Sequence, residues 1–235
     1  MKTVDEFKEG QVLLIDKPLN WTSFQIVNKI RWNIRQEFKL KKIKVGHAGT
    51  LDPLATGLLI LCTGKFTKII DTYQGQVKEY TGTITVGGTT ASYDLESEID
   101  QVFEYKHITE TQIKETTLQF IGDIDQKPPI FSAIKKDGRR LYKIARKGET
   151  VEIPFRQVRI DEFEITKIDL PNIEFRVVCS KGTYIRSLAF DFGKALDSGA
   201  HLSALRRTKI GNFSVEDAMN PFAFIDDLRG EEIQV

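Results

Sequence analysis

The spacing of hydrophobic residues in the first third of the chain predicts alternating strands and helices. Residues 11–16 (QVLLID) have the pattern of a strand that ends at Lys17-Pro18. Either Thr22 or Ser23 can cap the helix that follows, whose apolar residues recur near helical spacing: Phe24, Val27, Ile30, Ile34 and Phe38. The apolar run at 58–62 is typical of a buried strand.

The rest of the chain continues this mixture. Residues 78–88 alternate as a strand that the Gly87-Gly88 pair ends, and Thr109 with Gln112 fits a capping box for a helix running to about 121. One or two strands are expected over 155–168 and another over 173–180. A helix is expected over 183–198, with its apolar face formed by Ile185, Leu188, Ala189, Phe192 and Leu196.

Strands and helices intermix without a regular βα period, which favours a single α+β domain around a mixed sheet. We expect one catalytic domain over 1–235, with its core at about 10–228. The segment 127–154 is expected to be a basic excursion from this domain.

Composition excludes several classes of protein. No apolar run among the 235 residues approaches the roughly 18 that a membrane span needs, and the polar start lacks the apolar stretch of a signal peptide. Two cysteines and three scattered histidines form no metal-binding spacing and no disulfide framework. These features favour a reducing, cytoplasmic location and no metal site.

Charge is strongly segregated although 34 Lys and Arg nearly balance 33 Asp and Glu. Residues 24–44 hold seven basic residues and one acidic residue, and residues 127–147 hold eight basic residues and one acidic residue. Residues 91–125 have the opposite balance, with nine acidic and two basic residues. The pattern is consistent with a surface that binds a polyanion, or with ordinary solvated helix faces.

The segment Gly46–Gly57 (GHAGTLDPLATG) is the part of the chain most typical of a reactive loop. Glycines and a proline hold unusual backbone angles, and Asp52 is kept extended before Pro53. An Asp in this setting can be a reactive carboxylate or can simply cap a turn. The loop is not a phosphate-binding P-loop, since Gly64-Lys65 is followed by Phe66.

Five segments, in the same order, resemble motifs of the TruB family of tRNA pseudouridine synthases. The resemblance extends over roughly residues 10–228, and the segments that carry it are LLIDKPLNWTS (13–23), KVGHAGTLDPLATGLLILCTGKFTK (44–68), KEYTGTITVGGTTASYD (78–94), PPIFSAIKKDGRRLYKIARKGETVEIP (128–154), and CSKGTYIRSLAFDFGKAL with GAHLSALRRTKIG (179–211). The resemblance implies a pseudouridine-synthase-like, mainly antiparallel sheet flanked by helices, with an RNA-binding insertion.

The resemblance also implies a reaction. Uridine 55 in the T-loop of tRNA would be isomerised to pseudouridine after base flipping, with Asp52 as the nucleophile and with no cofactor or metal. Arg186 matches the arginine that pairs with this aspartate, and Tyr80 matches the tyrosine that packs against the target uracil.

Further residues match substrate-binding positions of the family. His47 would fill space near the vacated base stack, Tyr184 and Leu205 would form pocket walls, and Lys17 would shape the pocket. A basic cluster would grip the phosphates of the T-arm: Lys135, Lys136, Arg139, Arg140, Lys143, Arg146 and Lys147. The expected partner is tRNA, and the expected state is a monomer.

Two departures from the family pattern accompany this resemblance. We expect no C-terminal RNA-binding domain of the PUA type, and Ala91 replaces a frequently acidic residue, which weakens a role for the turn at 89–94. Two other functions fit part of the sequence. An RNA-binding or tRNA-folding module with secondary catalysis would use the same basic insertion, and a hydrolase that releases the base would also need a carboxylate.

Overall fold

The computed structural model describes residues 3–132, 134–136, 138–145 and 151–230. The chain divides into two compact units, Met1–Tyr80 with Leu205–Val235 and Thr81–Ala204. The boundaries fall within strands β4 (Lys78–Val86) and β12 (Ala200–Ile210), so each of these strands contributes residues to both units. The α+β class and the mainly antiparallel sheet are confirmed, whereas the single catalytic domain stays a prediction.

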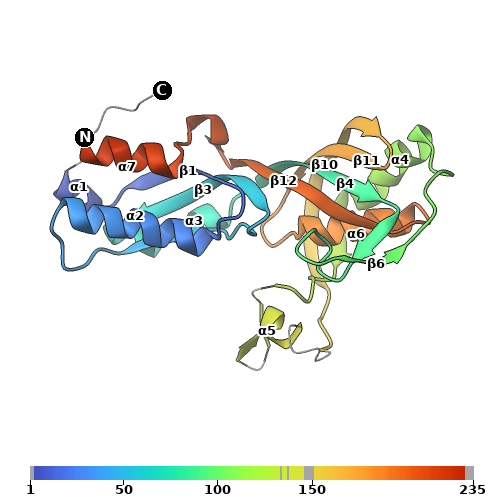
Figure 1. Cartoon of the computed structure of the whole chain (residues 1–235), viewed down its shortest axis with the longest axis horizontal. Helices are drawn as coiled ribbons and strands as arrows, with labels where there is room; N and C mark the ends of the chain where they lie inside the picture. Colours follow the sequence, from blue (N-terminus) through green and yellow to red (C-terminus); the bar gives the residue numbers. More distant parts are fainter. Residues whose placement is uncertain (1–2, 133, 137, 146–150, 231–235) are drawn as a thin grey trace. The chain divides into compact units, whose positions relative to one another are not determined.

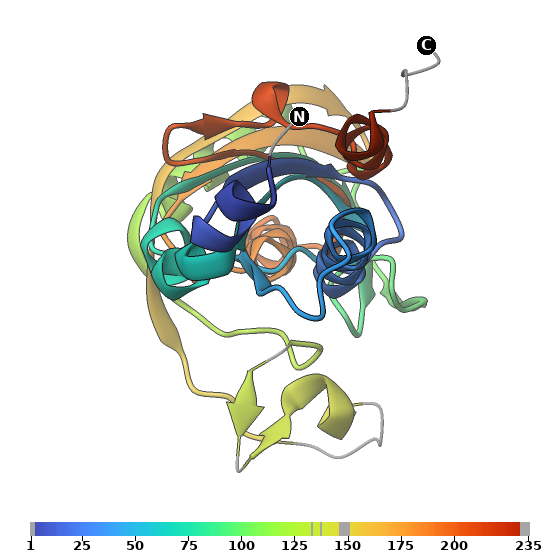
Figure 2. The ribbon, with the colours of Figure 1, turned by 90° about the vertical axis from the view of Figure 1, so that its left-hand side faces the viewer.

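The first unit is built on strands hydrogen-bonded in the order β1-β3-β12, with β2 on β3 and β13 on β12. Strands β1 and β3 are antiparallel, and β3 and β12 pair in parallel. Helices cover these strands (Figures 1 and 2). The elements are α1 (Val4–Glu9), β1 (Val12–Lys17), α2 (Ser23–Glu37), β2 (Val45–Ala48), β3 (Ala55–Thr63), η1 (Gly64–Ile69), α3 (Ile70–Gln74), β13 (Phe213–Ser214), η3 (Val215–Asp217) and α7 (Pro221–Arg229).

Alternation along β1 and β3 gives the first unit a hydrophobic cluster on each face of these strands. One cluster joins alternate strand residues such as Leu13 and Leu61 to α1, α2 and α7. The other joins residues such as Ile60 to β12 and the short elements after it. Helices α2 and α7 therefore share one core, and Figure 2 shows the two helices side by side.

Helix α2 begins as its local sequence predicts. Thr22 is the cap, because its side chain accepts a hydrogen bond from the Gln25 backbone N–H in a complete capping box. Its predicted apolar face is wrong at Phe24, which is 63% exposed, while Ile26 is buried. At about 100° per residue, Phe24 points about 115° away from the centre of the buried stripe.

In the second unit the strands are hydrogen-bonded in the order β12-β4-β11-β10-β7. Strand β10 is antiparallel to both β11 and β7. Two pairs of short strands, β5 with β6 and β8 with β9, lie outside this order. The elements are β5 (Gly88–Thr90), β6 (Ile99–Val102), α4 (Glu110–Thr117), η2 (Leu118–Phe120), β7 (Gly122–Gln126), β8 (Lys135–Lys136), β9 (Arg139–Arg140), α5 (Leu141–Ala145), β10 (Arg156–Asp169), β11 (Asn172–Cys179) and α6 (Ile185–Ala195).

Most predicted elements of the second unit are found, with different ends. The expected strand or strands over 155–168 form one continuous strand, β10. Thr109 caps α4 as predicted, but the α-helix ends at Thr117 and a 3-10 turn follows. Helix α6 is shorter than the predicted 183–198: Tyr184 is extended at its N-cap, and the helix ends at Ala195, with Leu196 as its C-cap. All five residues of its predicted apolar face are buried.

Candidate active site

Asp52 lies in the short loop between β2 and β3. The turn-rich segment predicted over 46–57 is partly strand, because β2 extends to Ala48 and β3 begins at Ala55, three residues before the expected strand at 58. The Asp52 carbonyl accepts a hydrogen bond from Ala55 N–H (3.1 Å), and the Pro53 carbonyl accepts one from Asn20 N–H (2.8 Å). These backbone hydrogen bonds fix the loop at Asp52 and directly after it.

The loop is also tied to the first turn of α2. Ser23 is buried, and its Oγ accepts a hydrogen bond from Leu51 N–H (2.8 Å) and donates one to the Leu51 carbonyl (3.1 Å). Ser23 therefore anchors the loop, and its neighbour Thr22 caps the helix. A rigid loop of this kind can hold a reactive side chain in one position.

Lys17 places a buried positive charge near Asp52. Its side chain is fully buried, and Nζ donates hydrogen bonds to the carbonyls of Pro18 (2.9 Å), Trp21 (2.7 Å) and Pro53 (3.4 Å). Burial lowers the pKa of Lys17 to about 8, and the charge of Asp52 opposes this shift. The opposite charges of the two groups therefore interact electrostatically.

Arg207 is a second buried cation of this unit, and sequence reasoning missed it. Its Nε donates to the Leu58 carbonyl (2.8 Å) and its Nη2 to the Gly49 carbonyl (3.1 Å). The neighbouring Arg206 instead forms a bidentate pair with Asp16, at 3.0 and 2.8 Å. Successive residues of a strand point to opposite faces of the sheet. In a strand with one face covered, an Arg-Arg pair therefore indicates that one of the two arginines is buried.

His47 and Arg207 interact electrostatically. Burial and then the charge of Arg207 lower the pKa of His47, while a backbone hydrogen bond with Gly49 acts in the opposite direction. A histidine with a lowered pKa is neutral at neutral pH. A neutral ring adds volume without adding charge, and the space-filling role of His47 stays a prediction.

Tyr80 and Leu205 belong to the first unit. Tyr80 lies in β4 and is the last residue of the unit's first chain segment, and Leu205 lies in β12 and is the first residue of its second segment. Tyr80 is buried, and Leu205 is paired with Ala55, three residues after Asp52 in the chain. The Thr56 hydroxyl also donates to the Leu205 carbonyl (3.5 Å). The first unit therefore contains Lys17, His47, Asp52, Tyr80 and Leu205 of the predicted site.

Arg186 belongs to the second unit, where it is buried in the first turn of α6. Its Nη1 donates to the Ser92 carbonyl (3.1 Å) and its Nη2 to the Phe131 carbonyl (2.9 Å). Its Nε lies 3.6 Å from Asp94 Oδ2, and both side chains are almost fully buried. The pairing of Arg186 with Asp52 that the resemblance implies stays a prediction.

Asp94 is the second charged residue that sequence reasoning missed. Its carboxylate accepts hydrogen bonds from Ser92 Oγ (2.6 Å) and from Glu96 N–H (3.0 Å), and its carbonyl accepts one from Thr90 Oγ1 (2.6 Å). The turn at 89–94 is thus organised by Asp94 despite Ala91, and it supports Arg186. The adjacent hydroxyl residues in TTASYD were the available signal, since such side chains often hydrogen-bond an Asp in a turn.

Tyr184 is fixed at the start of α6 through its backbone. The buried Gln126 side chain accepts from Tyr184 N–H (2.7 Å) and donates to its carbonyl (3.0 Å). Ser187 Oγ donates to the Lys127 carbonyl (2.8 Å). Strand β7 and the start of the basic segment are therefore attached to the helix that carries Arg186.

The basic segment contains a small structure of its own. Strands β8 and β9 pair antiparallel, and α5 packs Leu141 and Ile144 against Ile153. Of the predicted phosphate contacts, Lys135 and Lys136 lie in β8, Arg139 and Arg140 in β9, and Lys143 in α5, whereas Arg146 and Lys147 lie outside the described residues.

Within the described ranges, no group of three or more His, Cys, Asp or Glu side chains is placed to bind a metal ion. None of the helices described in the structure is long and apolar enough to cross a membrane.

Comparison with known proteins decides the family. Residues 35–185 match the model of the TruB family pseudouridylate synthase N-terminal domain, and residues 186–229 match that of the tRNA pseudouridylate synthase B C-terminal domain. The chain belongs to the TruB family. It is therefore an isomerase of the pseudouridylate synthase class, and its function lies in RNA modification.

Relatives named tRNA pseudouridine synthase B match over almost their whole lengths. The Flavobacterium johnsoniae protein is 64% identical over 97% of this chain and 100% of its own length. The Phocaeicola vulgatus protein is 55% identical over 97% of both chains. The Chlorobaculum tepidum protein is 45% identical over 94% of this chain and 92% of its own.

Solved structures share the fold of the TruB chain. In a Cbf5-Nop10-Gar1 complex, the matched chain is 30% identical with a TM-score of 0.70, covering 94% of this chain and 54% of that one. In an H/ACA RNP bound to a substrate RNA containing 2′-deoxyuridine, the matched chain is 26% identical with a TM-score of 0.69. This match covers 99% of this chain and 59% of that one. The chain thus spans little more than half the length of these structural relatives.

Proposed function

We propose that this TruB-family chain isomerises uridine 55 in the T-loop of tRNA to pseudouridine, with Asp52 as the nucleophile. The observation that carries the proposal is the setting of Asp52. A loop fixed by backbone and Ser23 hydrogen bonds holds the carboxylate near the buried ammonium of Lys17. A rigid, electrostatically stabilised carboxylate suits covalent catalysis, because it can bond to a substrate carbon and leave again.

The reaction breaks the N1–C1′ glycosidic bond and forms a C5–C1′ bond, after which the C5 proton is lost and N1 gains one. Atoms and electrons balance without an oxidant or a second substrate. Asp52 attacks in its ionised form, so no general base is needed to activate it. Neutral His47 would fill space near the vacated base stack, buried Tyr80 would pack against the flipped uracil, and Lys17 would preserve the charge of Asp52.

The remaining parts of the proposal concern the RNA and the cell. Arg186 is proposed to act on the Asp52 carboxylate, Tyr184 and Leu205 to line the uridine pocket, and the basic insertion to hold T-arm phosphates. We propose a single catalytic domain that works as a monomer in the cytoplasm.

The test compares wild type with Asp52→Asn on an unmodified tRNA transcript. Asparagine keeps the shape of the side chain but is not a nucleophile. We therefore expect no multiple-turnover pseudouridine formation, while the tRNA dissociation constant changes less than about threefold. Asp71→Asn, an exposed change at the start of α3, serves as the control with wild-type activity.

Sequencing of the modified position and intact RNA mass are the two readouts. Isomerisation leaves the mass of the RNA unchanged, whereas base release does not. Multiple turnover by Asp52→Asn, modification at another position, or loss of uracil would each contradict the proposal.

A further inference from the structure

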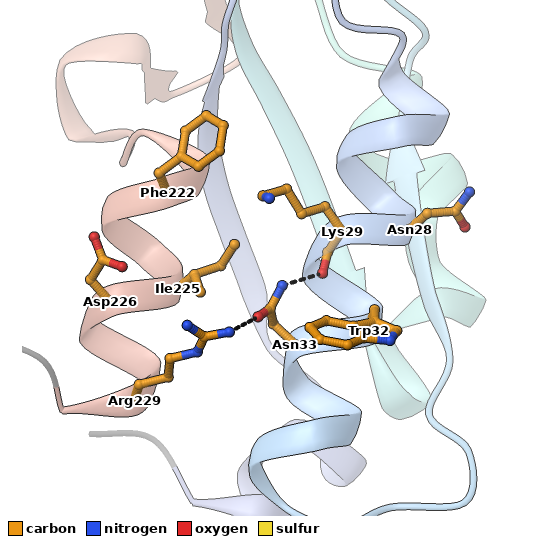
Figure 3. A pocket seen from close by; sticks show the side chains of 8 residues that line it. All are labelled: Asn28, Lys29, Trp32, Asn33, Phe222, Ile225, Asp226 and Arg229. Carbon is orange, nitrogen blue, oxygen red and sulfur yellow. Dashed lines mark hydrogen bonds between the residues drawn. The ribbon is translucent and has the colours of Figure 1, made fainter.

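A groove between α2 and α7 of the first unit combines exposed aromatic rings with cations (Figure 3). Its volume of about 520 Å³ is in the range of small-ligand sites. Trp32 is 53% exposed and Phe222 is 45% exposed, while Ile225 between them in the lining is buried. Large aromatic rings exposed at a concave surface favour a ligand with a flat face.

The cation of Lys29 is held at this groove by aromatic rings. Its Nζ lies 4.7 Å from the centre of the Phe222 ring and 5.8 Å from that of Trp21. An ammonium held by ring faces keeps its charge and its N–H donors for an anion. Arg229, across the groove, donates to Asn33 Oδ1 (2.9 Å), which fixes a second cation in the lining (Figure 3).

Asp226 is the acidic residue of the same lining. A carboxylate repels a phosphate, but it accepts hydrogen bonds from the amino and imino groups of a nucleobase. The groove thus offers a stacking surface, a cation for a phosphate and an acceptor for a base edge. A nucleotide has the three matching groups.

The α2 side of the groove is basic, which favours RNA over a protein partner, whereas α7 carries Asp226 and Asp227 besides Arg229. Helix α2 also carries Arg31 and Arg35, and the only acidic residue between Phe24 and Lys44 is Glu37. The helix begins at Ser23, which is bonded to the loop that holds Asp52. Trp32 is nine residues further along, about 14 Å at 1.5 Å per residue. The groove therefore lies within the length of a few nucleotides of the residue that anchors the Asp52 loop.

We propose that the α2–α7 groove binds an unpaired nucleotide of the substrate RNA. The base stacks on Trp32, and the phosphate lies against Lys29. The proposal rests on the proposed function only in taking tRNA as the bound molecule. It adds a binding surface in the first unit, separate from the loop that holds Asp52 and from the basic insertion.

The first experiment measures binding of unmodified tRNA transcript in variants that also carry Asp52→Asn, so that no turnover occurs. Stacking of a base on an aromatic residue corresponds to about a five- to 150-fold change in affinity, and we expect Trp32→Ala to weaken binding within that range. Trp32→Phe should recover most of the loss. Phe24→Ala is the matched control, because Phe24 is more exposed and lies on the same helix outside the groove.

The second experiment uses the fact that the chain has two tryptophans, Trp21 and Trp32. Trp21→Phe leaves Trp32 as the only indole, and stacking of a base should quench its fluorescence as tRNA is added. Chemical unfolding checks that Trp32→Ala is folded.

The outcomes separate this proposal from the proposed function. Weakened binding with Trp32→Ala, rescue by Trp32→Phe and quenching support the groove even if the wild type forms no pseudouridine. Binding within twofold of wild type for Trp32→Ala, an equal loss for Phe24→Ala, or no quenching would overturn it.

Discussion

Lys17 is a fully buried lysine whose charge depends on pH within the range used for enzyme assays. Its pKa is lowered to about 8 by burial, although the carboxylates of Asp52 and Asp16 act in the opposite direction. Below that pH its ammonium lies near Asp52. Above it the ammonium is lost, together with its stabilisation of the carboxylate.

We therefore predict that kcat/KM of the wild-type enzyme falls as pH rises through about 8. Lys17→Met lacks the charge at every pH, so its rate should be lower and nearly flat between about pH 7 and 9. Pseudouridine formation at constant ionic strength gives both profiles. A Lys17→Met enzyme with the wild-type rate and the same alkaline decline would assign the titration to another group.

Linkage shows that this decline is not unfolding caused by Lys17. The unfolded chain keeps the proton of Lys17 up to its ordinary pKa of 10.5, whereas the folded chain loses it at about 8. Between these values the unfolded state binds more protons, so the free energy of unfolding rises with pH on account of Lys17. Unfolding measured at pH 8 and pH 10 in wild type and Lys17→Met provides the check.

At the scale of single residues, the sequence singled out the positions that stand in motifs, whose roles stay predictions, but not the residues that support them. Asp52, Lys17 and Arg186 stand in segments with a distinctive local sequence. Arg207 and Asp94 act through partners distant in the sequence, the Gly49 carbonyl and the Arg186 guanidinium. No local pattern encodes such pairings, because they form only when the chain is folded.

At the scale of elements, prediction succeeded where local caps decide the structure. Thr22 and Thr109 form the capping boxes that their sequences indicate. The loop around Asp52 is shorter than predicted because β2 and β3 are extended by pairing: His47 is opposite Leu61, and Gly57 is opposite Arg207. Pairing of this kind depends on the partner strand rather than on local glycine content.

Gly57 is the residue of this segment at which a side chain cannot be accommodated. Its φ is +101°, and an added Cβ would lie 2.3 Å from the Arg207 carbonyl oxygen and 2.7 Å from the Arg207 nitrogen. Because both clashes are with backbone, Gly57→Ala must separate β3 from β12. We expect it to lower the free energy of unfolding by at least about 3 kcal/mol.

Gly122→Ala is the matched control for Gly57→Ala. Gly122 has a similar φ of +97°, but an added Cβ would meet nothing within 4 Å. Gly122→Ala should therefore lower the free energy of unfolding through backbone strain alone, by about 1–2 kcal/mol. Urea unfolding followed by circular dichroism measures both variants. Equal losses in the two variants would mean that contact with Arg207 contributes nothing.

At the scale of the whole molecule, the two basic segments are distributed between the two units. Residues 24–44 belong to the first unit and residues 127–147 to the second. Their charge was evident from the sequence. Their surroundings were not: the first segment flanks an aromatic groove, and the second forms a hairpin and helix with a small core.

The last prediction concerns how the insertion contributes to RNA affinity. Lysines and arginines that contact phosphates release counterions, so each contact adds somewhat under about one unit to the slope of log affinity against log salt. Replacing Lys135, Lys136, Arg139 and Arg140 with Gln should therefore lower the slope for tRNA by up to about three units. Titration of tRNA at a series of salt concentrations measures the slope.

The control must remove the same net charge from elsewhere, because a change in overall charge alone alters long-range attraction. Lys8, Lys65, Lys114 and Lys167 suit this purpose, since each lies within 4 Å of an acidic side chain: Asp5, Glu9, Glu110 and Glu174 respectively. Their replacement by Gln should leave the slope nearly unchanged if phosphate contact, rather than net charge, carries the effect. Equal slopes for the two fourfold variants would remove the insertion from the RNA interface. A reduced slope that falls further with Lys29→Gln would show that the insertion and the α2–α7 groove contact separate phosphates.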